Sequence, residues 1–465
     1  MNDPSRSPNS RQSATTMLMH GLSMLLVLSV VQRAIGFGRQ VFFCRELDAS
    51  QFGLWELSYG FLVVVSPLVV LALPGTLGRY AGVFADSGTL RAFLCHIATI
   101  CILTTFAAAG VMFVTPTFWS RVIFDSTDPA LVPLIQWTAI SLAMANAMNF
   151  AWEMFTALKD LRGTAMLQFG SSAGFALLAL LMLPHNATAP TAMIAYLGSC
   201  VAVVGWAAWR GWRLVQTLPA DTRPLPIAEM GRRIGPTALW LGTGVVMVLA
   251  FDYVDRLLPV RLLGAEEGIR LVGTVGSARV VPMLLVSVTT MLIAAMMPHW
   301  ADDHRRSRTH RLVRRVDFFL GVQTAMLVMA GLAMGLAVPW VLGPLFLNHY
   351  ASAEAVFPIV TLSAIGLALI QIIQGWFLCI ERLGQSVTVL GAGLFFKVLL
   401  AAVLIPRYGL VGSVAATLIA HFGTLAALVA IASYHGLRLR ATTWLILAVL
   451  TLSAIFMTIH SLSSG

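Results

Sequence analysis

Residues 355–380 read AVFPIVTLSAIGLALIQIIQGWFLCI, a run of 26 residues without a charged side chain. A helix of about 20 apolar residues crosses the hydrocarbon core of a bilayer, so this stretch predicts a membrane-spanning helix. Similar runs fill the rest of the chain, at residues 17–38, 53–78, 92–114, 130–157, 163–183, 190–212, 234–258, 271–298, 316–341, 384–405, 409–433 and 441–460. The sequence therefore predicts thirteen spans.

The composition of the 465-residue chain agrees with a multi-pass membrane protein. Apolar residues make up 58% of the chain and charged residues only 11%, and the mean hydropathy is +0.84. Soluble domains carry roughly 25% charged residues, so a secreted enzyme, a nucleic-acid-binding module and a disulfide scaffold are excluded. The five cysteines lack zinc-site or disulfide spacing and are interpreted as packing residues. We expect the polar residues 1–16 to be disordered.

Basic residues are distributed unequally between alternate loops. With the N-terminus in the cytoplasm, twenty Lys and Arg residues fall in the cytoplasmic connections and seven in the opposite ones. Cytoplasmic loops are enriched in Lys and Arg, so the sequence predicts a cytoplasmic N-terminus. The densest basic run, DDHRRSRTHRLVRR at residues 302–315, is interpreted as a cytoplasmic loop. Binding of nucleic acid or lipid headgroups by this run is the less favoured alternative.

The polar stretch 213–233 divides the chain into two halves that look like diverged repeats. Gly53 and Gly273 stand near the start of the second span of each half, and each precedes a basic residue by 26 positions. Transporters are often built from such repeats. The sequence therefore predicts an N-lobe of six spans at 17–212, a cytoplasmic linker at 213–233, a C-lobe of six spans at 234–433 and one extra C-terminal helix within 434–465.

Motifs of enzymatic chemistry are missing or lie in the wrong context. The only lysines, Lys159 and Lys397, are not part of a phosphate-binding loop, and no zinc-hydrolase motif occurs. Gly170 to Gly174 match G-x-S-x-G but lie in the middle of an apolar helix, where G-x-x-x-G spacing lets two helices approach closely. The outer connections are short. The sequence therefore predicts a protein that is not an enzyme and holds no cofactor or metal.

Ionisable side chains inside the predicted spans mark the candidate site. Such groups cost roughly 2.5–3.5 kcal/mol to insert at the helix centre, so they tend to face a cavity or a partner. The deep ones are cationic: Arg33, Arg279 and Lys397. Guanidinium groups bind phosphate through paired hydrogen bonds, so we expect a cavity that attracts an anion. The alternative for Arg33 and Lys397 is that they extend outward to the membrane interface.

The carboxylates lie nearer the span ends. Glu153 is placed toward the cytoplasmic end of the fourth span, and Asp252 and Asp255 toward the outer end of the seventh. All three are candidates for coupling to an ion or a proton. Asp252 and Arg256 are four residues apart on one helix face, so pairing with each other is an equal alternative. For Glu153, a structural ion pair is favoured over coupling.

Short motifs along most of the chain carry a family resemblance. They are QRAIGFGR at residues 32–39, QFGLW at 51–55, GTLGRY at 75–80, DRLL at 255–258 and YGLVGSVAA at 408–416. Together they resemble the polysaccharide transporter (O-antigen-type flippase) branch of the multidrug/oligosaccharidyl-lipid/polysaccharide (MOP) exporter superfamily. This resemblance implies a V-shaped bundle of two lobes that opens alternately to either leaflet. Family members usually have twelve or fourteen spans, so the predicted thirteen depart from the pattern.

The resemblance also implies a function and a site. Such proteins move undecaprenyl-pyrophosphate-linked oligosaccharides across the bacterial plasma (inner) membrane. In related peptidoglycan-precursor flippases, first-span arginines line a central cationic cavity, and Arg33 and Arg39 hold the matching places here. The expected substrate-binding residues are therefore Arg33, Arg39, Arg256, Arg279 and Lys397. Removal of the charge at Arg33 or Arg279 is predicted to abolish export.

Two alternatives to the flippase stay open. One is an ion-coupled exporter of small amphiphiles on the same fold, which would place acids deep in its cavity. The other is a membrane-embedded glycan polymerase or ligase, which the short outer loops disfavour. The expected partners are the lipid-linked oligosaccharide, the bilayer and a polysaccharide polymerase or assembly protein. We expect a monomer that does not bind nucleic acid.

Overall fold

The computed structural model describes residues 28, 30–346, 351–441, 443–444, 448–453 and 456–457. Within these residues the regular structure is entirely helical, and ten helices are long and apolar enough to cross a membrane. The predicted all-α multi-pass fold is therefore confirmed. The expected disorder of residues 1–16 lies outside the described residues.

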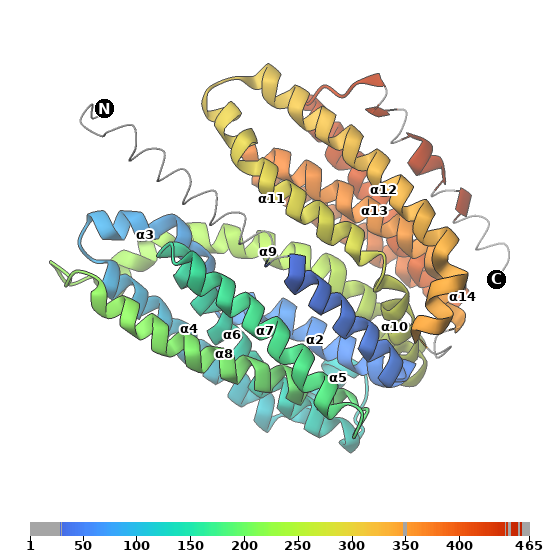
Figure 1. The fold of residues 1–465 in the computed structure, drawn as a ribbon, viewed down its shortest axis with the longest axis horizontal. Coiled ribbons are helices and arrows are strands. Elements are labelled where there is room, and N and C mark those ends of the chain that lie inside the picture. The colour runs from blue at the N-terminus through green and yellow to red at the C-terminus, as the bar shows by residue number, and fades with distance from the viewer. Residues whose placement is uncertain are drawn as a thin grey trace.

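The helices follow one another with short connections (Figure 1). The first half contains a helix over residues 30–46, α2 (Ala49–Val69), η1 (Pro74–Thr76), α3 (Leu77–Asp86), α4 (Leu90–Val114), α5 (Pro116–Phe124), η2 (Pro129–Leu131), α6 (Val132–Ala157), α7 (Leu161–Met182) and α8 (Ala189–Thr217). The second half contains α9 (Ile227–Leu263), α10 (Ala265–Arg279), α11 (Met283–Arg305), α12 (Thr309–Phe346), α13 (Ala351–Cys379) and α14 (Leu383–Tyr434).

The ten long helices of the described residues account for the second to the twelfth predicted spans. Two predicted spans, 384–405 and 409–433, both lie within α14, whose backbone leaves helical geometry at Gly409 (φ 50°, ψ −120°). A Cβ on Gly393 would touch Thr424, and one on Gly412 would overlap the carbonyl of Leu404. The chain therefore reverses near Gly409 into two antiparallel helices. The first and thirteenth predicted spans lie partly outside the described residues.

The second span of each half is broken, whereas the sequence predicted continuous helices over 53–78 and 271–298. α2 ends at Val69, two residues after Pro67, and Leu71 and Ala72 take positive φ angles before η1. In the second half, α10 ends at Arg279 and Pro282 caps the start of α11. Proline removes a backbone donor and collides with the preceding turn, so both breaks have the same physical cause.

The two polar stretches were predicted as loops, but fewer of their residues are non-helical than predicted. Of residues 213–233, only 218–226 are non-helical, and the basic run 302–315 is helical except at 306–308. Arginine is a good helix former, so a run of charge does not by itself end a helix. The Gly170–Gly174 segment lies inside α7, where Cβ atoms on its two glycines would contact Val203 and Ser199 of α8. The packing interpretation of this motif is therefore confirmed.

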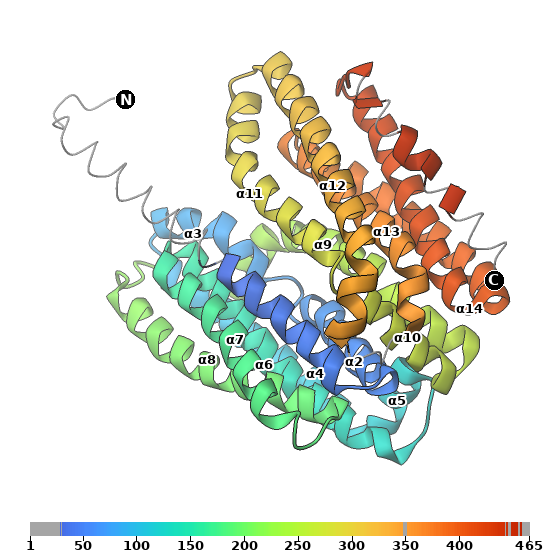
Figure 2. The ribbon, with the colours of Figure 1, turned by 45° about the vertical axis from the view of Figure 1, so that its right-hand side comes forward.

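The helices form two lobes arranged as a V. We call α2–α8 with the helix over 30–46 the N-lobe, and α10–α14 with the C-terminal half of α9 the C-lobe. In Figure 2 the lobes meet around α2, α5 and α10 and diverge toward the far ends of α3 and α11. The meeting point is very close, because a Cβ on Gly53 would overlap the backbone of Ile269 and one on Gly273 would overlap that of Ala49. The two glycines that begin the matched spans therefore form the crossing between the lobes.

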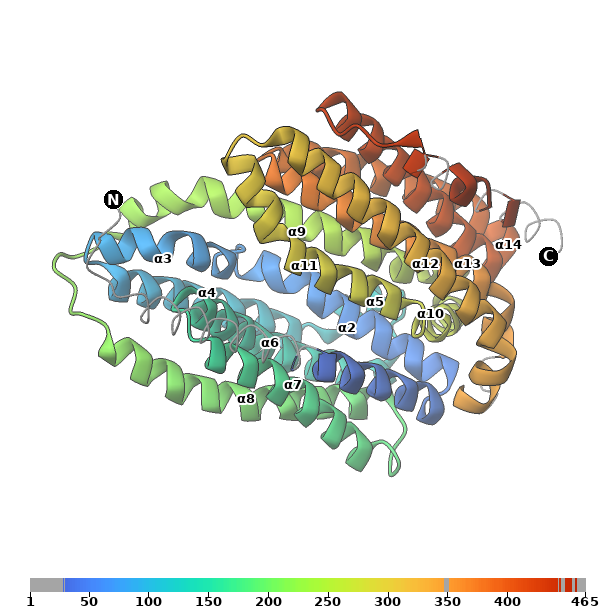
Figure 3. The ribbon, with the colours of Figure 1, turned by 45° about the horizontal axis from the view of Figure 1, so that its top comes forward.

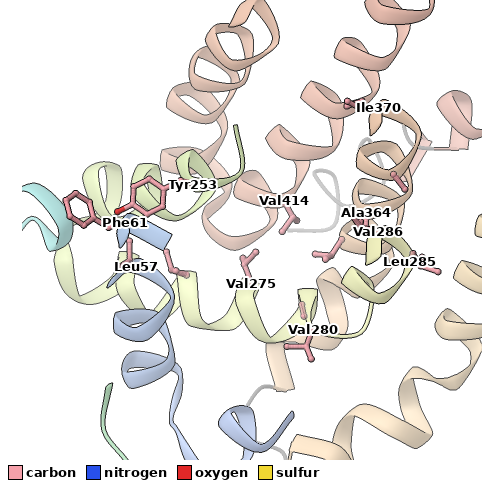
Figure 4. Packing of buried hydrophobic residues seen from close by; sticks show 14 of the residues in the cluster. Leu57, Phe61, Tyr253, Val275, Val280, Leu285, Val286, Ala364, Ile370 and Val414 are labelled. Carbon is pink, nitrogen blue, oxygen red and sulfur yellow. The ribbon is translucent and has the colours of Figure 1, made fainter. Parts of the chain in front are cut away.

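The long helix α9 runs from one lobe to the other (Figure 3). Its first turns pack with the N-lobe, where Met230, Ile234 and Ala238 share a buried cluster with residues of α3 and α4. The Tyr80 hydroxyl lies 2.8 Å from that of Thr237. Its C-terminal half belongs to a second apolar cluster that reaches from α2 through α9 and α10 to α13 and α14. Figure 4 shows Phe61 of α2 beside Tyr253 of α9 in this cluster.

Candidate functional site

A cavity of about 310 Å³ lies between the two lobes. We call it the inter-lobe cavity. The helix over 30–46 and α2 form its N-lobe side, and α9, α10 and α11 form its C-lobe side. Its lining residues are Arg33, Gly36, Phe37, Gln40, Glu56, Asp252, Arg256, Gly276, Arg279, Val280, Met283, Leu284 and Ser287. The break between α10 and α11 therefore lies at its wall, through Val280, in agreement with the rule that irregular backbone at membrane depth lines a cavity or is buried in protein. α2 contributes Glu56, near the start of the helix, and not its break.

Charged side chains form a chain of ion pairs along one wall of the inter-lobe cavity. Arg256 Nε donates to Glu56 Oε2 at 2.8 Å, and its Nη1 donates to Asp252 Oδ2 at 2.7 Å. Arg279 Nη2 donates to the other Asp252 oxygen at 2.5 Å. Gln40 Nε2 donates to Glu56 Oε1 at 3.1 Å. Glu56 and Gln40 come from the N-lobe and the other three from the C-lobe, so this network joins the lobes.

The predicted pairing of Asp252 with Arg256 is therefore present. Asp252 in addition holds Arg279, which the sequence placed with the substrate-binding cations. Within a helix, residues four apart share a face, so the Asp252–Arg256 pair follows from spacing alone. Glu56 is the residue that sequence reasoning missed. Its position inside an apolar run was the available signal.

Lys397 and Asp255 lie together in the interior of the C-lobe rather than at the inter-lobe cavity. Lys397 Nζ is 2.7 Å from Asp255 Oδ1, and the two side chains are 1% and 7% exposed. The ammonium also donates to the backbone carbonyl of Phe251 at 2.7 Å. The alternative that Lys397 extends outward to the membrane interface is excluded by this burial.

Arg33 and Arg39 differ from the other cations, because neither forms an ion pair within the part of the chain that the structure describes. Arg33 lines the inter-lobe cavity. Arg39 lies on the same helix but outside the cavity lining, with its guanidinium carbon 4.2 Å from the centroid of the Phe175 ring. Its Nε is buried and has no hydrogen-bond partner among the residues that the structure describes. The geometry therefore brings Arg33, Arg256 and Arg279 to one cavity and places Arg39 and Lys397 elsewhere.

Glu153 lies in a different cavity, of about 450 Å³, between the N-lobe and α9. This N-lobe cavity is lined by aromatic side chains, Tyr59, Trp152 and Tyr196, and by Asn149, whose amide donates to Ser66 Oγ at 3.2 Å. Glu153 is half-buried and takes part in no ion pair among the described residues. The predicted structural ion pair of Glu153 is therefore not seen there. Among the same residues, no group of three or more His, Cys, Asp or Glu side chains is placed to hold a metal ion.

The comparisons with known proteins concern the fold. The sequence matches no model of a protein family and no curated protein. Among solved structures it is similar to the lipid II flippase MurJ in an inward closed conformation, with a TM-score of 0.69 and 10% identity over 94% of this chain and 91% of that one.

Two further solved structures show the same likeness. The first is a multidrug resistance MATE family transporter of the MOP superfamily in an inward-facing conformation, with a TM-score of 0.67 and 13% identity over 87% of this chain and 95% of that one. The second is a MOP superfamily transporter from Pyrococcus furiosus, with a TM-score of 0.63 and 13% identity over 89% and 95%. The chain therefore has the fold of the MOP superfamily transporters.

Proposed function

We propose that this protein moves a lipid-linked oligosaccharide, attached through pyrophosphate to a polyprenyl chain, across the bacterial plasma membrane. In this proposal the substrate headgroup enters the inter-lobe cavity while the lipid chain stays in the bilayer. A sugar headgroup cannot cross hydrocarbon alone, because each unpaired polar group costs several kcal/mol there. The N-terminus lies in the cytoplasm, as the loop charges indicate, and no chemical step is involved.

The observation that carries the proposal is Arg33, a cation at the inter-lobe cavity without a carboxylate partner among the described residues. The other lining charges cancel, since Arg256 and Arg279 face Glu56 and Asp252. Within the described lining the balance is one positive charge, and it lies on the N-lobe side. An anionic headgroup supplies the missing partner for Arg33, and its phosphate oxygens suit the donors of a guanidinium group.

Arg33→Ala tests this assignment through binding rather than export. The purified variant is titrated with undecaprenyl pyrophosphate in detergent, with wild-type protein beside it. A hydrogen bond to a charged group contributes about 1.5–3 kcal/mol, so we expect the dissociation constant to rise about tenfold to a hundredfold. Arg45→Ala is the matched control, because Arg45 is exposed on the same helix and does not line the cavity.

The outcome separates the proposal from a nonspecific charge effect. Equal weakening by Arg33→Ala and Arg45→Ala, or no weakening by either, contradicts the proposed site. Arg279→Ala is a less direct test than the sequence indicated, because Arg279 also neutralises Asp252 inside the protein. Identification of the lipid that copurifies with the wild-type protein, by native mass spectrometry, provides an independent test of the substrate class.

A second candidate function rests on the N-lobe cavity. Three aromatic residues and the half-buried Glu153 suit an organic cation, which gains from aromatic faces and from a carboxylate. This arrangement fits the alternative of an exporter of small amphiphiles. Binding of a fluorescent aromatic cation that is lost in Glu153→Gln and kept in Arg33→Ala favours this second function over the flippase.

A further inference from the structure

The ammonium group of Lys397 lies inside the C-lobe, where solvent does not reach it. Its Nζ contacts two oxygen atoms of α9, one of the Asp255 carboxylate and the carbonyl oxygen of Phe251, each at 2.7 Å. The ammonium also lies 4.6 Å from the centroid of the Phe251 ring. The residue is 1% exposed and does not line the inter-lobe cavity. Lys397 is therefore not placed to bind a transported molecule.

Asp255 has more acceptor capacity than Lys397 uses. Thr417 Oγ1 donates to Asp255 Oδ1 at 2.7 Å, while Oδ2 is buried without a hydrogen-bond partner among the described residues and lies 3.6 Å from Arg279 Nη2. Beside the carboxylate is a small space of about 20 Å³ that Arg279, Ser363, Ser413 and Thr417 also line. This volume admits one water molecule. The Asp255 carboxylate, the Phe251 carbonyl and the Thr417 hydroxyl thus gather around Lys397 and Asp255, beside a space for one water molecule.

Oxygen atoms of this kind are the ligands that hard cations prefer in proteins, and carbonyls of transporter helices bind Na⁺ in the same way. We infer that the C-lobe contains a cage for a monovalent cation, that the Lys397 ammonium permanently occupies it, and that removal of the ammonium opens a Na⁺ site. In the wild-type protein this cage therefore takes up no metal ion. The inference does not depend on which substrate the inter-lobe cavity binds.

The cage also explains why a lysine is tolerated at this depth. A buried charge without a partner is strongly destabilising, and Arg279, which lies 3.6 Å from Asp255, is bound more closely to Asp252, so Asp255 needs a nearer positive partner. A tethered ammonium supplies that partner at any external ion concentration. Lys397 lies in the first helix of the α14 hairpin and Asp255 in α9, so the pair also ties these two helices together.

Lys397→Ala tests the inference by thermal unfolding of the purified full-length protein. The unfolding midpoint is measured in sodium chloride and in choline chloride at equal ionic strength. We expect the midpoint of the wild-type protein to be the same in both salts. That of Lys397→Ala should be lower in choline and rise with Na⁺ concentration, in proportion to the logarithm of the concentration above the dissociation constant. Lys159→Ala is the matched control, since Lys159 is the other lysine of the chain and lies in a loop.

A second variant separates the cage from general destabilisation. In Asp255→Asn combined with Lys397→Met the buried charges are removed together, so this protein should fold and its midpoint should not respond to Na⁺. The inference is overturned if wild-type protein shows the Na⁺-dependent rise, if the double variant shows it, or if Lys397→Ala folds and does not respond. Recovery of folded Lys397→Ala from sodium-containing buffer alone supports the cage, and its loss in both salts overturns it.

Discussion

Glu56→Gln is expected to weaken the link between the lobes at the closed end of the V. Glu56 lies on α2 of the N-lobe, and its carboxylate accepts hydrogen bonds from Arg256 of the C-lobe and from Gln40. The side chains of Glu56 and Arg256 are only 10% and 20% exposed, so solvent screens their interaction weakly. The substitution should therefore raise the population of molecules in which the lobes separate at this end.

The size of the effect follows from the change in charge. Glutamine keeps an acceptor oxygen but loses the charge, and hydrogen bonds to charged groups contribute about 1.5–3 kcal/mol against about 0.5–1.5 kcal/mol for neutral ones. The loss is therefore about 1–1.5 kcal/mol, which corresponds to roughly a tenfold change in the ratio of closed to open molecules.

A second pair across the same end provides the comparison. Arg261 of α9 donates to Asp125 of the N-lobe and, at 2.6 Å, to the carbonyl of Val122. The side chains of Arg261 and Asp125 are 36% and 41% exposed. Exposed pairs contribute about 0–1 kcal/mol, so Asp125→Asn should change the same ratio by less than about fivefold.

Spin-label distances between the lobes measure this ratio. Thr127 and Glu267 are exposed on opposite lobes at the closed end, and labels at both positions report its separation. Cys95 is exposed and is first replaced by serine, so that it does not take up label. The reasoning is refuted if Glu56→Gln leaves the distance distribution unchanged, or if Asp125→Asn shifts it by more than Glu56→Gln does.

Three other predictions concern stability. Gly53→Ala places a Cβ against the backbone of α10 and should lower stability by about 1–3 kcal/mol in chemical unfolding. Gly78→Ala, with open space around it in α3, should not lower stability, because alanine favours a helix more than glycine does. The two hydrogen bonds from Arg210 hold the pKa of Asp160 below its ordinary value, so this pair stabilises the protein above pH of about 3.9 and the stabilisation is lost as pH falls through the lowered pKa. Asp160→Asn should accordingly lower the unfolding midpoint at neutral pH and leave it unchanged in acid. Asp317 accepts hydrogen bonds from the backbone and side chains just after α14, so Asp317→Asn should speed proteolysis of that segment, and an unchanged cleavage rate would count against this contact.

The membrane helices could be read from the sequence because the bilayer constrains them strongly. Backbone groups in hydrocarbon must bond within the segment, so an apolar run of sufficient length forms a helix whatever its neighbours are. The breaks in the second span of each half were harder to predict from the sequence. Pro67 and Pro282 marked the two positions, but the sequence could not show whether each proline bends a helix or ends it, since that depends on the packing around the freed backbone groups.

The sequence predicted which types of residue form the candidate site, but only some of the ion pairs between them. The Asp252–Arg256 pair lies within one helical turn, so its spacing was visible. The partner of Arg256 from the other lobe, Glu56, lies 200 positions away in sequence, and Lys397 lies far from Asp255. Nothing in local sequence relates such residues. The predicted cationic set is therefore divided by the structure between the inter-lobe cavity, an aromatic contact and the interior of the C-lobe.

Hydropathy and charge, taken alone, determined that this chain is a helical multi-pass membrane protein with ionisable groups inside its spans. These properties depend on the transfer of each segment into lipid, which is a local quantity. The tertiary structure decided which charges neutralise one another and which one, Arg33, stays without a carboxylate partner among the described residues at the cavity. That outcome depends on how α2, α9 and α10 cross at Gly53 and Gly273, because ion pairing falls off within a few ångströms and only packing brings distant side chains that close.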